Sequence, residues 1–371
     1  AFNIQPAKSE WTGTVHIRAD GSIDPSGAPI ITYDNITYTL TDNITSSADG
    51  IVVERDNIVI DGAGYTLQGT GSGKGVDLSG RSNVTIKNAT ITTFYYGIKL
   101  SYSSSYNTIS GNNITVNSGD GVWLSHSSSY NIIVGNNITA NNDDGILLYS
   151  SSNNSIVENN MTANSGDGIA LFWSSNNNII VGNNVANNDD GILLDYSSNN
   201  TISGNTFTDD GLNVWGSYHN VVEDNTVNGK PLVYLEGVAD YSVEDAGQVI
   251  LVNCAGIRVE NLNLSHTSIG VQLLRTNNSI ISRNTIANNK YGIMLSHSSN
   301  NSIVENNMTA NNGDGIFLYN SSNNRFYHNN FIDNSQQVYS LVSTNVWDDG
   351  YPSGGNYWSN YTGVDADGDG I

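Results

Sequence analysis

Hydrophobic residues recur along this chain in short alternating runs, at a nearly constant interval. Each run begins with a glycine followed by an apolar-x-apolar triplet, as in GILL at 145–148 and again at 191–194. Within each of two series these glycines are 20 to 24 residues apart: Gly97, Gly121, Gly145, Gly168, Gly191 and Gly211, then Gly270, Gly292 and Gly315. Period-two alternation predicts β-strands, and a fixed period of this length predicts a solenoid or array.

Each repeat carries a second motif, apolar-x-x-Asn-x-apolar. It reads ISGNNI at 109–114 and IVGNNI at 133–138. The alternation changes parity before the asparagine, so the chain must bend there. A unit is therefore two or three short strands joined by turns rich in Ser and Asn, such as SYSSSYN. One unit cannot bury its apolar side alone, but stacked units share a continuous core.

Stacking in register, at about 4.8 Å per coil, turns each repeat position into a row along the molecule. One row should be interior and apolar, formed by Leu100, Leu124, Leu148, Leu171 and Leu194. An asparagine row should lie at the bend, where amides can bond one another: Asn112, Asn136, Asn159, Asn183, Asn205, Asn284, Asn306 and Asn329. The predicted fold is all-β, a right-handed parallel β-helix.

The repeat also predicts how the chain is divided. Residues 1–50 lack the period and should form an N-terminal β cap. The β-helix is expected over 51–227 and again over 257–340, with irregular coils or an insertion at 228–256. Residues 341–371 are rich in aromatics and glycine and should form a C-terminal cap with an acidic tail.

The composition of the chain limits the classes of molecule that it is expected to bind. The 371 residues include 35 acidic and 13 basic side chains, a net charge of −22. This field repels nucleic acid, which is excluded as a partner, and attracts metal cations. No apolar run reaches the ~18 residues of a membrane span, so any membrane anchor is expected beyond Ile371. Cys254 is the only cysteine, and its apolar surroundings predict a buried, inert thiol.

The repeats, the interruption NGKPLVYLEG…GQVILVNC…VENLNLS and the ending GYPSGGNYWSNYTGVDADGDGI resemble archaeal cell-surface proteins with NosD-type parallel β-helix repeats. The resemblance covers nearly the whole chain. It implies a right-handed β-helix and export to an extracellular place on the cell surface. The wider superfamily includes copper-delivery proteins, polysaccharide lyases and hydrolases, epimerases and surface-layer components, so the function stays open.

An acidic residue precedes most of the anchor glycines. The row comprises Asp120, Asp144, Asp167, Asp190 and Asp210, with Asp314 later. It is read as solvated turn residues, as a ladder that binds Ca²⁺ or other cations, or as a catalytic carboxylate cluster. The solvated turn is favoured, because a uniform row with no basic row beside it lacks the asymmetry of acid–base catalysis.

The ending DADGDGI matches the first half of a calcium-binding loop. Its oxygen ligands would be Asp365, Asp367 and Asp369. The alternative is a flexible acidic linker to a downstream region. Calcium is the one cofactor suggested, and no organic cofactor is expected.

Copper would need converging His, Met or Cys side chains. His126 and His297 hold the same repeat position but lie many coils apart. Met161 and Met308 fall on inward apolar positions. Copper delivery is therefore disfavoured.

The position two residues after each anchor glycine points outward yet is often apolar. The expected contact or glycan surface combines it with nearby aromatics: Trp123, Leu147, Leu193, Tyr149, Trp173, Tyr196 and Trp215. Residues 228–256 or the C-terminal segment could cover this stripe, or it could bind neighbouring molecules or sugar rings. N-glycosylation is suggested at sequons such as Asn113, Asn137, Asn160 and Asn307.

Together these patterns favour a non-enzymatic, exported structural protein. It would assemble with copies of itself into a surface layer, sheath or filament, stabilised by Ca²⁺. Two alternatives stay open. One is a polysaccharide-active lyase, hydrolase or epimerase, and the other is a glycan-binding adhesin.

Overall fold

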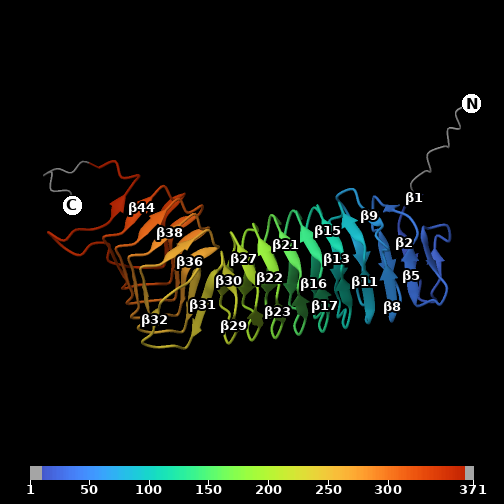
Figure 1. The fold of residues 1–371 in the computed structure, drawn as a ribbon, viewed down its shortest axis with the longest axis horizontal. Coiled ribbons are helices and arrows are strands. Elements are labelled where there is room, and N and C mark those ends of the chain that lie inside the picture. Colours follow the sequence, from blue (N-terminus) through green and yellow to red (C-terminus); the bar gives the residue numbers. More distant parts are fainter. Residues whose placement is uncertain (1–10, 364–371) are drawn as a thin grey trace, which may run out of the picture. The chain divides into compact units, whose positions relative to one another are not determined.

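The computed structural model describes residues 11–363, which form strands and turns and no α-helix. The described part of the chain accordingly has no helix suited to crossing a membrane. The chain divides after Asn184 into two compact units. Figure 1 shows short strands following one another coil by coil in each unit.

In unit 1, residues 1–184, each regular coil has three strands that belong to three parallel sheets. Sheet B contains β2 (Val15–Ile17), β7 (Ile51–Val53), β10 (Lys74–Asp77), β13 (Tyr96–Leu100), β16 (Val122–Ser125), β19 (Ile146–Tyr149) and β22 (Ile169–Phe172). Sheet C contains β5 (Thr37–Leu40), β8 (Ile58–Asp61), β11 (Val84–Lys87), β14 (Thr108–Ser110), β17 (Ile132–Val134), β20 (Ser155–Val157) and β23 (Ile179–Val181). Sheet A contains β1 (Trp11–Thr12), β6 (Ile44–Thr45), β9 (Thr66–Gln68), β12 (Thr90–Thr92), β15 (Asn113–Thr115), β18 (Asn137–Thr139) and β21 (Asn160–Thr162).

Two antiparallel edge strands close the first coils of unit 1. Strand β3 (Ile23–Asp24) pairs with β2, and β4 (Ile30–Thr32) pairs with β5. A short antiparallel strand leaves no long parallel edge for another chain to join. Strand β24 (Asn184–Ala186) lies at the division between the units.

Strand register confirms the interior apolar row. In sheet B, Leu100 is aligned with Leu124, Leu124 with Leu148, and Leu148 with Leu171. These leucines are 0% exposed, as is Leu194 in unit 2. The predicted parallel β-helix is confirmed.

The anchor glycine of the repeat is required by close approach between coils. A Cβ added to Gly121 would lie 2.6 Å from the carbonyl oxygen of Gly145 and equally close to the Ile138 side chain. Real Cβ atoms do not approach other atoms so closely, so any larger residue would push the coils apart.

Asparagine ladders occupy three corners of unit 1, where the sequence predicted one. The three rows are Asn107, Asn131, Asn154 and Asn178; Asn112, Asn136, Asn159 and Asn183; and Asn117, Asn141 and Asn164. The Asn136 Oδ1 atom accepts bonds from the backbone N–H and the Nδ2 of Asn112, at 2.9 and 3.0 Å. Asn136 Nδ2 donates in turn to Asn159 Oδ1 and to the Ile109 carbonyl. These buried amides satisfy both themselves and the turn backbone.

Unit 2, residues 185–371, begins with two more coils of the same kind. Their strands are β25 (Ile192–Asp195), β26 (Thr201–Ser203), β27 (Thr206–Thr208), β28 (Leu212–Trp215), β29 (Val221–Glu223) and β30 (Thr226–Val227). The chain then reverses at Asn228-Gly229, where both residues have positive φ, 51° and 78°. This Asn-Gly turn makes β31 (Lys230–Glu236) antiparallel to β30 and ends the first series of repeats.

The remaining coils of unit 2 form three parallel sheets. The long-strand sheet contains β31, β33 (Gln248–Val252), β36 (Ile269–Leu274), β39 (Tyr291–Ser296), β42 (Asp314–Tyr319) and β45 (Gln336–Leu341). A second sheet contains β32 (Ser242–Val243), β34 (Arg258–Glu260), β37 (Ile280–Ser282), β40 (Ser302–Val304) and β43 (Arg325–Tyr327). The third contains β35 (Asn263–Ser265), β38 (Thr285–Ala287), β41 (Asn307–Thr309), β44 (Asn330–Ile332) and β46 (Tyr357–Trp358).

Two buried glutamines close the edge of β28 inside unit 2. Gln248 accepts a bond from the Leu212 N–H and donates to the Leu212 carbonyl, at 2.9 and 2.7 Å. Gln272 does the same for Val214, at 3.1 and 2.8 Å. Each side-chain amide takes the place of a peptide group in a neighbouring strand. The long-strand sheet thus covers the end of the preceding coils with its outer side.

Aromatic side chains cover the last coil of unit 2. The Trp347 ring stacks on Phe326 and the Trp358 ring stacks on Phe331, each with centroids 4.3 Å apart. Asn356 takes the last place of an asparagine ladder, because its Oδ1 accepts the Asn329 N–H at 3.0 Å.

The ladder predicts that substitutions of two adjacent asparagines will differ strongly in their effect on the free energy of unfolding. Replacing Asn136 with Ala should lower the free energy of unfolding by about 3 kcal/mol, because buried backbone and amide donors lose their acceptor. Asn137 points outward and bonds only to its row neighbours, so Asn137→Ala should cost less than about 1 kcal/mol. Urea denaturation of both variants measures this difference. Equal losses would contradict the role of the inward ladder.

Candidate functional site

The outer face of sheet B in unit 1 brings charged and aromatic side chains together in two rows. Strand register aligns Lys74 with Tyr96, Asp77 with Lys99, and Lys99 with Trp123. We call this surface the B face. Gly50 and Gly75 hold the anchor position in the two coils before Gly97. The row before the anchor glycines is Asp49, Lys74, Tyr96, Asp120 and Asp144, and the row two residues after them is Val52, Asp77, Lys99, Trp123 and Leu147.

Three carboxylates meet at one end of the B face. An oxygen from each of Asp120, Asp143 and Asp144 lies within 4.8 Å of the others. Asp120 is 3% exposed, whereas Asp143 faces solvent. Burial, followed by the charges of Asp144 and Asp143, raises the pKa of Asp120 to about 8. At neutral pH the buried Asp120 carboxyl group is therefore protonated, and Asp143 is its solvent-exposed neighbour.

The solvated-turn reading of the acidic row was wrong. The exposed fractions are 3% for Asp120, 8% for Asp144, 6% for Asp167, 2% for Asp190 and 1% for Asp210. In unit 1 the reason is a ladder like that of the asparagines. The Asp144 N–H donates to Asp120 Oδ1 at 3.1 Å, and the Asp167 N–H donates to Asp144 Oδ1 at 2.7 Å.

An aromatic pair and a lysine lie beside the acidic cluster. The Tyr96 and Trp123 rings stack with centroids 4.6 Å apart. Lys99 Nζ lies 4.5 Å from the Trp123 centroid, a cation–π distance. Burial, followed by the charge of Asp120, raises the pKa of Tyr96 to about 12, so its hydroxyl group stays protonated.

The B face continues into a shallow hollow of about 260 Å³. It is lined by Val52, Val53, Glu54, Asp77, Ser79 and Arg81. Lys74 lies beside it, with Nζ 2.8 Å from Asp77 and 3.6 Å from Asp49. No basic row was expected beside the acidic row, and the register adds one lysine to the row itself. Lys74 occupies the same row two coils before Asp120, a relation that only the register reveals.

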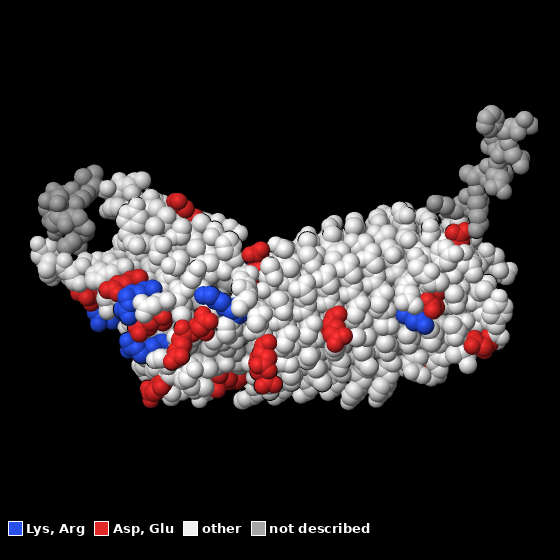
Figure 2. Space-filling model, viewed as in Figure 1, with Lys and Arg blue, Asp and Glu red and all other residues white. Residues whose placement is uncertain are grey.

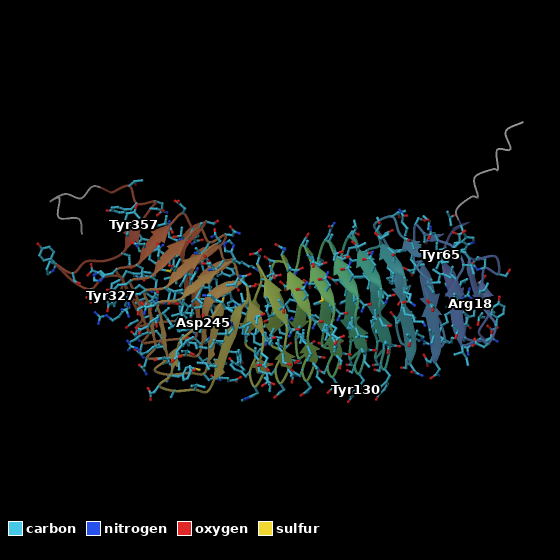
Figure 3. The ribbon with its side chains drawn as sticks, in the orientation of Figure 1. Arg18, Tyr65, Tyr130, Asp245, Tyr327 and Tyr357 are labelled. Atoms are coloured by element: carbon cyan, nitrogen blue, oxygen red, sulfur yellow. The ribbon has the colours of Figure 1, made fainter. Side chains whose placement is uncertain are left out.

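The expected apolar stripe forms a row in unit 1, where Trp123 is aligned with Leu147 and Leu147 with Ala170, but it is interrupted or covered in unit 2. Leu147 and Leu193 are half-buried, and Met294, at the same repeat position, is 1% exposed. In unit 2 the long-strand sheet covers part of the stripe, where the Trp215 ring packs edge-on against Phe317. The expected aromatics Tyr149, at the end of β19, and Trp173 and Tyr196, on turns, are exposed. The stacked Tyr106 and Tyr130 are exposed on turns as well. Figure 3 shows Tyr130 at the outer margin of its coil.

The sequons lie in strands. Asn113, Asn137 and Asn160 face outward from sheet A, and Asn307 lies in β41. The Asn137 amide donates to Asn113 at 2.8 Å, and the Asn160 amide donates to Asn137 at 2.7 Å. Glycosylation would replace these bonds, and it stays a prediction. The calcium-loop residues Asp365, Asp367 and Asp369 lie outside the described residues.

Comparison with known protein families identifies the family to which the chain belongs. The model of the periplasmic copper-binding protein NosD matches residues 141–242 and 241–363. A right-handed β-helix region matches residues 26–185. The chain therefore belongs to the NosD family of right-handed parallel β-helices.

Solved structures with a similar fold include two mannuronan C-5 epimerase A-modules from Azotobacter vinelandii. AlgE4 is 16% identical, with a TM-score of 0.41 over 90% of this chain and 91% of the module. AlgE6 is also 16% identical, with a TM-score of 0.42 over 91% and 90%. The pectate lyase Pel9A is 16% identical, with a TM-score of 0.36 over 50% of this chain and 61% of the lyase. A search of curated proteins found no match.

The described residues do not fit the copper ion of the family's name. Met161 and Met308 are fully buried in the core, and the Cys254 thiol donates to backbone carbonyls. His126 contacts Tyr102 and Ser125, while His297 contacts Ser296 and Tyr319. The metal-compatible clusters found among residues 11–363 contain only carboxylates, which suit hard cations such as Ca²⁺.

The raised pKa of Asp120 predicts a pH-dependent stability. Because the folded state holds this proton more tightly than the unfolded state, stability should fall as pH rises from about 4 to 8. Asp120→Asn keeps the acceptor for the Asp144 N–H and removes the charge. It should raise the free energy of unfolding at pH 8 by on the order of 3 kcal/mol, with little effect at pH 4.

Denaturant titrations at several pH values measure this effect. Glu158→Gln is the control, because Glu158 is an exposed acidic residue of unit 1 outside the cluster, and it should change stability by less than about 1 kcal/mol. An Asp120→Asn effect that does not change with pH would contradict a buried, protonated carboxyl group.

Proposed function

We propose that this protein binds a glycan along the B face of unit 1. The observation that carries the proposal is the alignment of Tyr96, Lys99 and Trp123 between the hollow and the Asp120 cluster. Aromatic rings provide apolar contact for sugar rings, and neighbouring polar groups fix their orientation. Export fits this function, because a polysaccharide would be met outside the cell.

Glycan cleavage is the second candidate function. It is favoured by the different environments of Asp120 and Asp143, since glycoside hydrolysis uses one protonated carboxyl group and one carboxylate. Asp120 would donate a proton to the leaving oxygen. Asp143 is the exposed partner that would act as base or nucleophile.

Self-assembly was the function favoured by the sequence, and its main support was a long outer apolar stripe. The aligned row of Trp123, Leu147 and Ala170 is confined to a few coils of unit 1, and in unit 2 Asn213 follows Leu193 and Met294 is covered. Assembly through another surface stays a proposal, as does Ca²⁺ binding by the carboxylates.

A test of glycan binding uses two tryptophans of unit 1. Trp123→Ala should weaken binding of a polysaccharide that the wild type retains by about tenfold, the loss expected for one aromatic contact. Trp173→Ala removes a tryptophan that is 54% exposed on a turn away from the B face rows, and it should bind like the wild type. Affinity electrophoresis and isothermal titration calorimetry measure both.

The same samples decide between binding and cleavage. Release of reducing ends that is lost in Asp120→Asn would support the enzyme, whereas binding without release supports an adhesin-type protein. If Trp123→Ala and Trp173→Ala bind every tested glycan as the wild type does, the B face is not the binding site.

A further inference from the structure

Lys99 is an unusual cation in this acidic chain. Most of the described lysines and arginines form ion pairs, for example Lys74 with Asp77 and Lys87 with Asp61. Among residues 11–363, no carboxylate lies within the 4.0 Å pairing distance of Lys99 Nζ. Its ammonium group contacts the Trp123 and Tyr96 rings instead, at 4.5 and 5.8 Å from their centroids.

The surroundings of Lys99 leave part of its charge uncompensated. Partial burial, followed by the neighbouring Lys74, lowers the pKa of Lys99. Asp77, aligned with Lys99 on the adjacent strand, is engaged by Lys74 at 2.8 Å and by the Ser79 N–H. Asp120, which precedes Trp123 by three residues, is protonated at neutral pH and adds little negative charge. An anionic group placed at Lys99 would therefore gain a partner without displacing an existing ion pair.

We infer that the B face selects anionic glycans, whose sugars carry carboxylate or sulfate groups, and that Lys99 is the residue that sets this preference. The inference rests on the proposed glycan-binding function and adds the class of ligand. The anionic substituent would accept a hydrogen bond from Lys99 Nζ while the sugar contacts the Trp123 and Tyr96 rings. Charge complementarity of this kind contributes mainly to specificity.

The acidic character of the whole protein does not oppose a local preference of this kind. Unit 1 contains 15 acidic and 7 basic residues, whereas unit 2 contains 20 and 6. On the face shown in Figure 2, charged side chains gather on the C-terminal part of unit 2. At about 0.15 M salt, charges farther than about 8 Å from the ligand are largely screened, so the net charge of the whole chain does not decide the local preference.

The test compares three polysaccharides of similar length: a polyuronate, a sulfated glucan and a neutral glucan. Binding to the full chain is measured by titration calorimetry at about 0.15 M salt. Lys99→Gln should lower affinity for the preferred anionic polymer by about tenfold, the loss expected for one charge-assisted hydrogen bond, and should change neutral-glucan binding less than twofold.

Two further variants separate charge from folding. Lys99→Arg keeps the cation and should retain the anionic preference. Lys87→Gln makes the same change of charge on sheet C, where Lys87 pairs with Asp61 at 3.2 Å, and should bind like the wild type. Circular dichroism confirms that each variant is folded before it is compared.

The outcomes distinguish the inference from the function on which it rests. A preference for either anionic polymer that disappears in Lys99→Gln supports the inference. The polymer that binds shows whether the recognised group is a carboxylate or a sulfate. Equal, Trp123-dependent binding of neutral and anionic polymers overturns the inference but keeps the proposed function. Absence of binding to all three polymers overturns both.

Discussion

Hydrogen bonding between equivalent asparagines of successive coils is the constraint on which the other features depend. Within a row, an inward amide oxygen accepts a backbone and a side-chain bond from the asparagine of the coil before it, as Asn136 does from Asn112. A shift by one residue would turn every inward side chain outward and leave these buried groups unpaired. The ladders therefore fix the register, and the register fixes which side chains meet on each outer face.

The B face follows directly from this geometry. Its residues are separated in sequence by whole repeats, and they come together because neighbouring strands are aligned residue by residue. The aspartates form a similar ladder in the opposite direction, in which a carboxyl oxygen accepts a hydrogen bond from the backbone N–H of the next coil. Burial in a ladder then gives Asp120 a proton at neutral pH, which a solvated turn would not do.

Much of the fold could be predicted from the sequence, because period-two alternation and a fixed repeat directly encode strands and stacking. The predictions of an interior leucine row containing Leu100 and of an asparagine row containing Asn112 were both correct. The candidate site was harder to predict from the sequence. Lys74 and Lys99 precede the regular acidic row, and only the aligned strands place them beside Tyr96 and Trp123. The sequence also contains Gln248 and Gln272 without any sign that they close β28, because this contact depends on the chain reversal at Asn228-Gly229.

A crystal structure of the full chain with a bound acidic oligosaccharide tests the central claim most directly. The account predicts sugar rings against Trp123 and Tyr96, an anionic group within hydrogen-bond distance of Lys99 Nζ, and the leucine row in register beneath them. An oligosaccharide bound on sheet A or sheet C, or coils whose register separates Lys99 from Trp123, would contradict it.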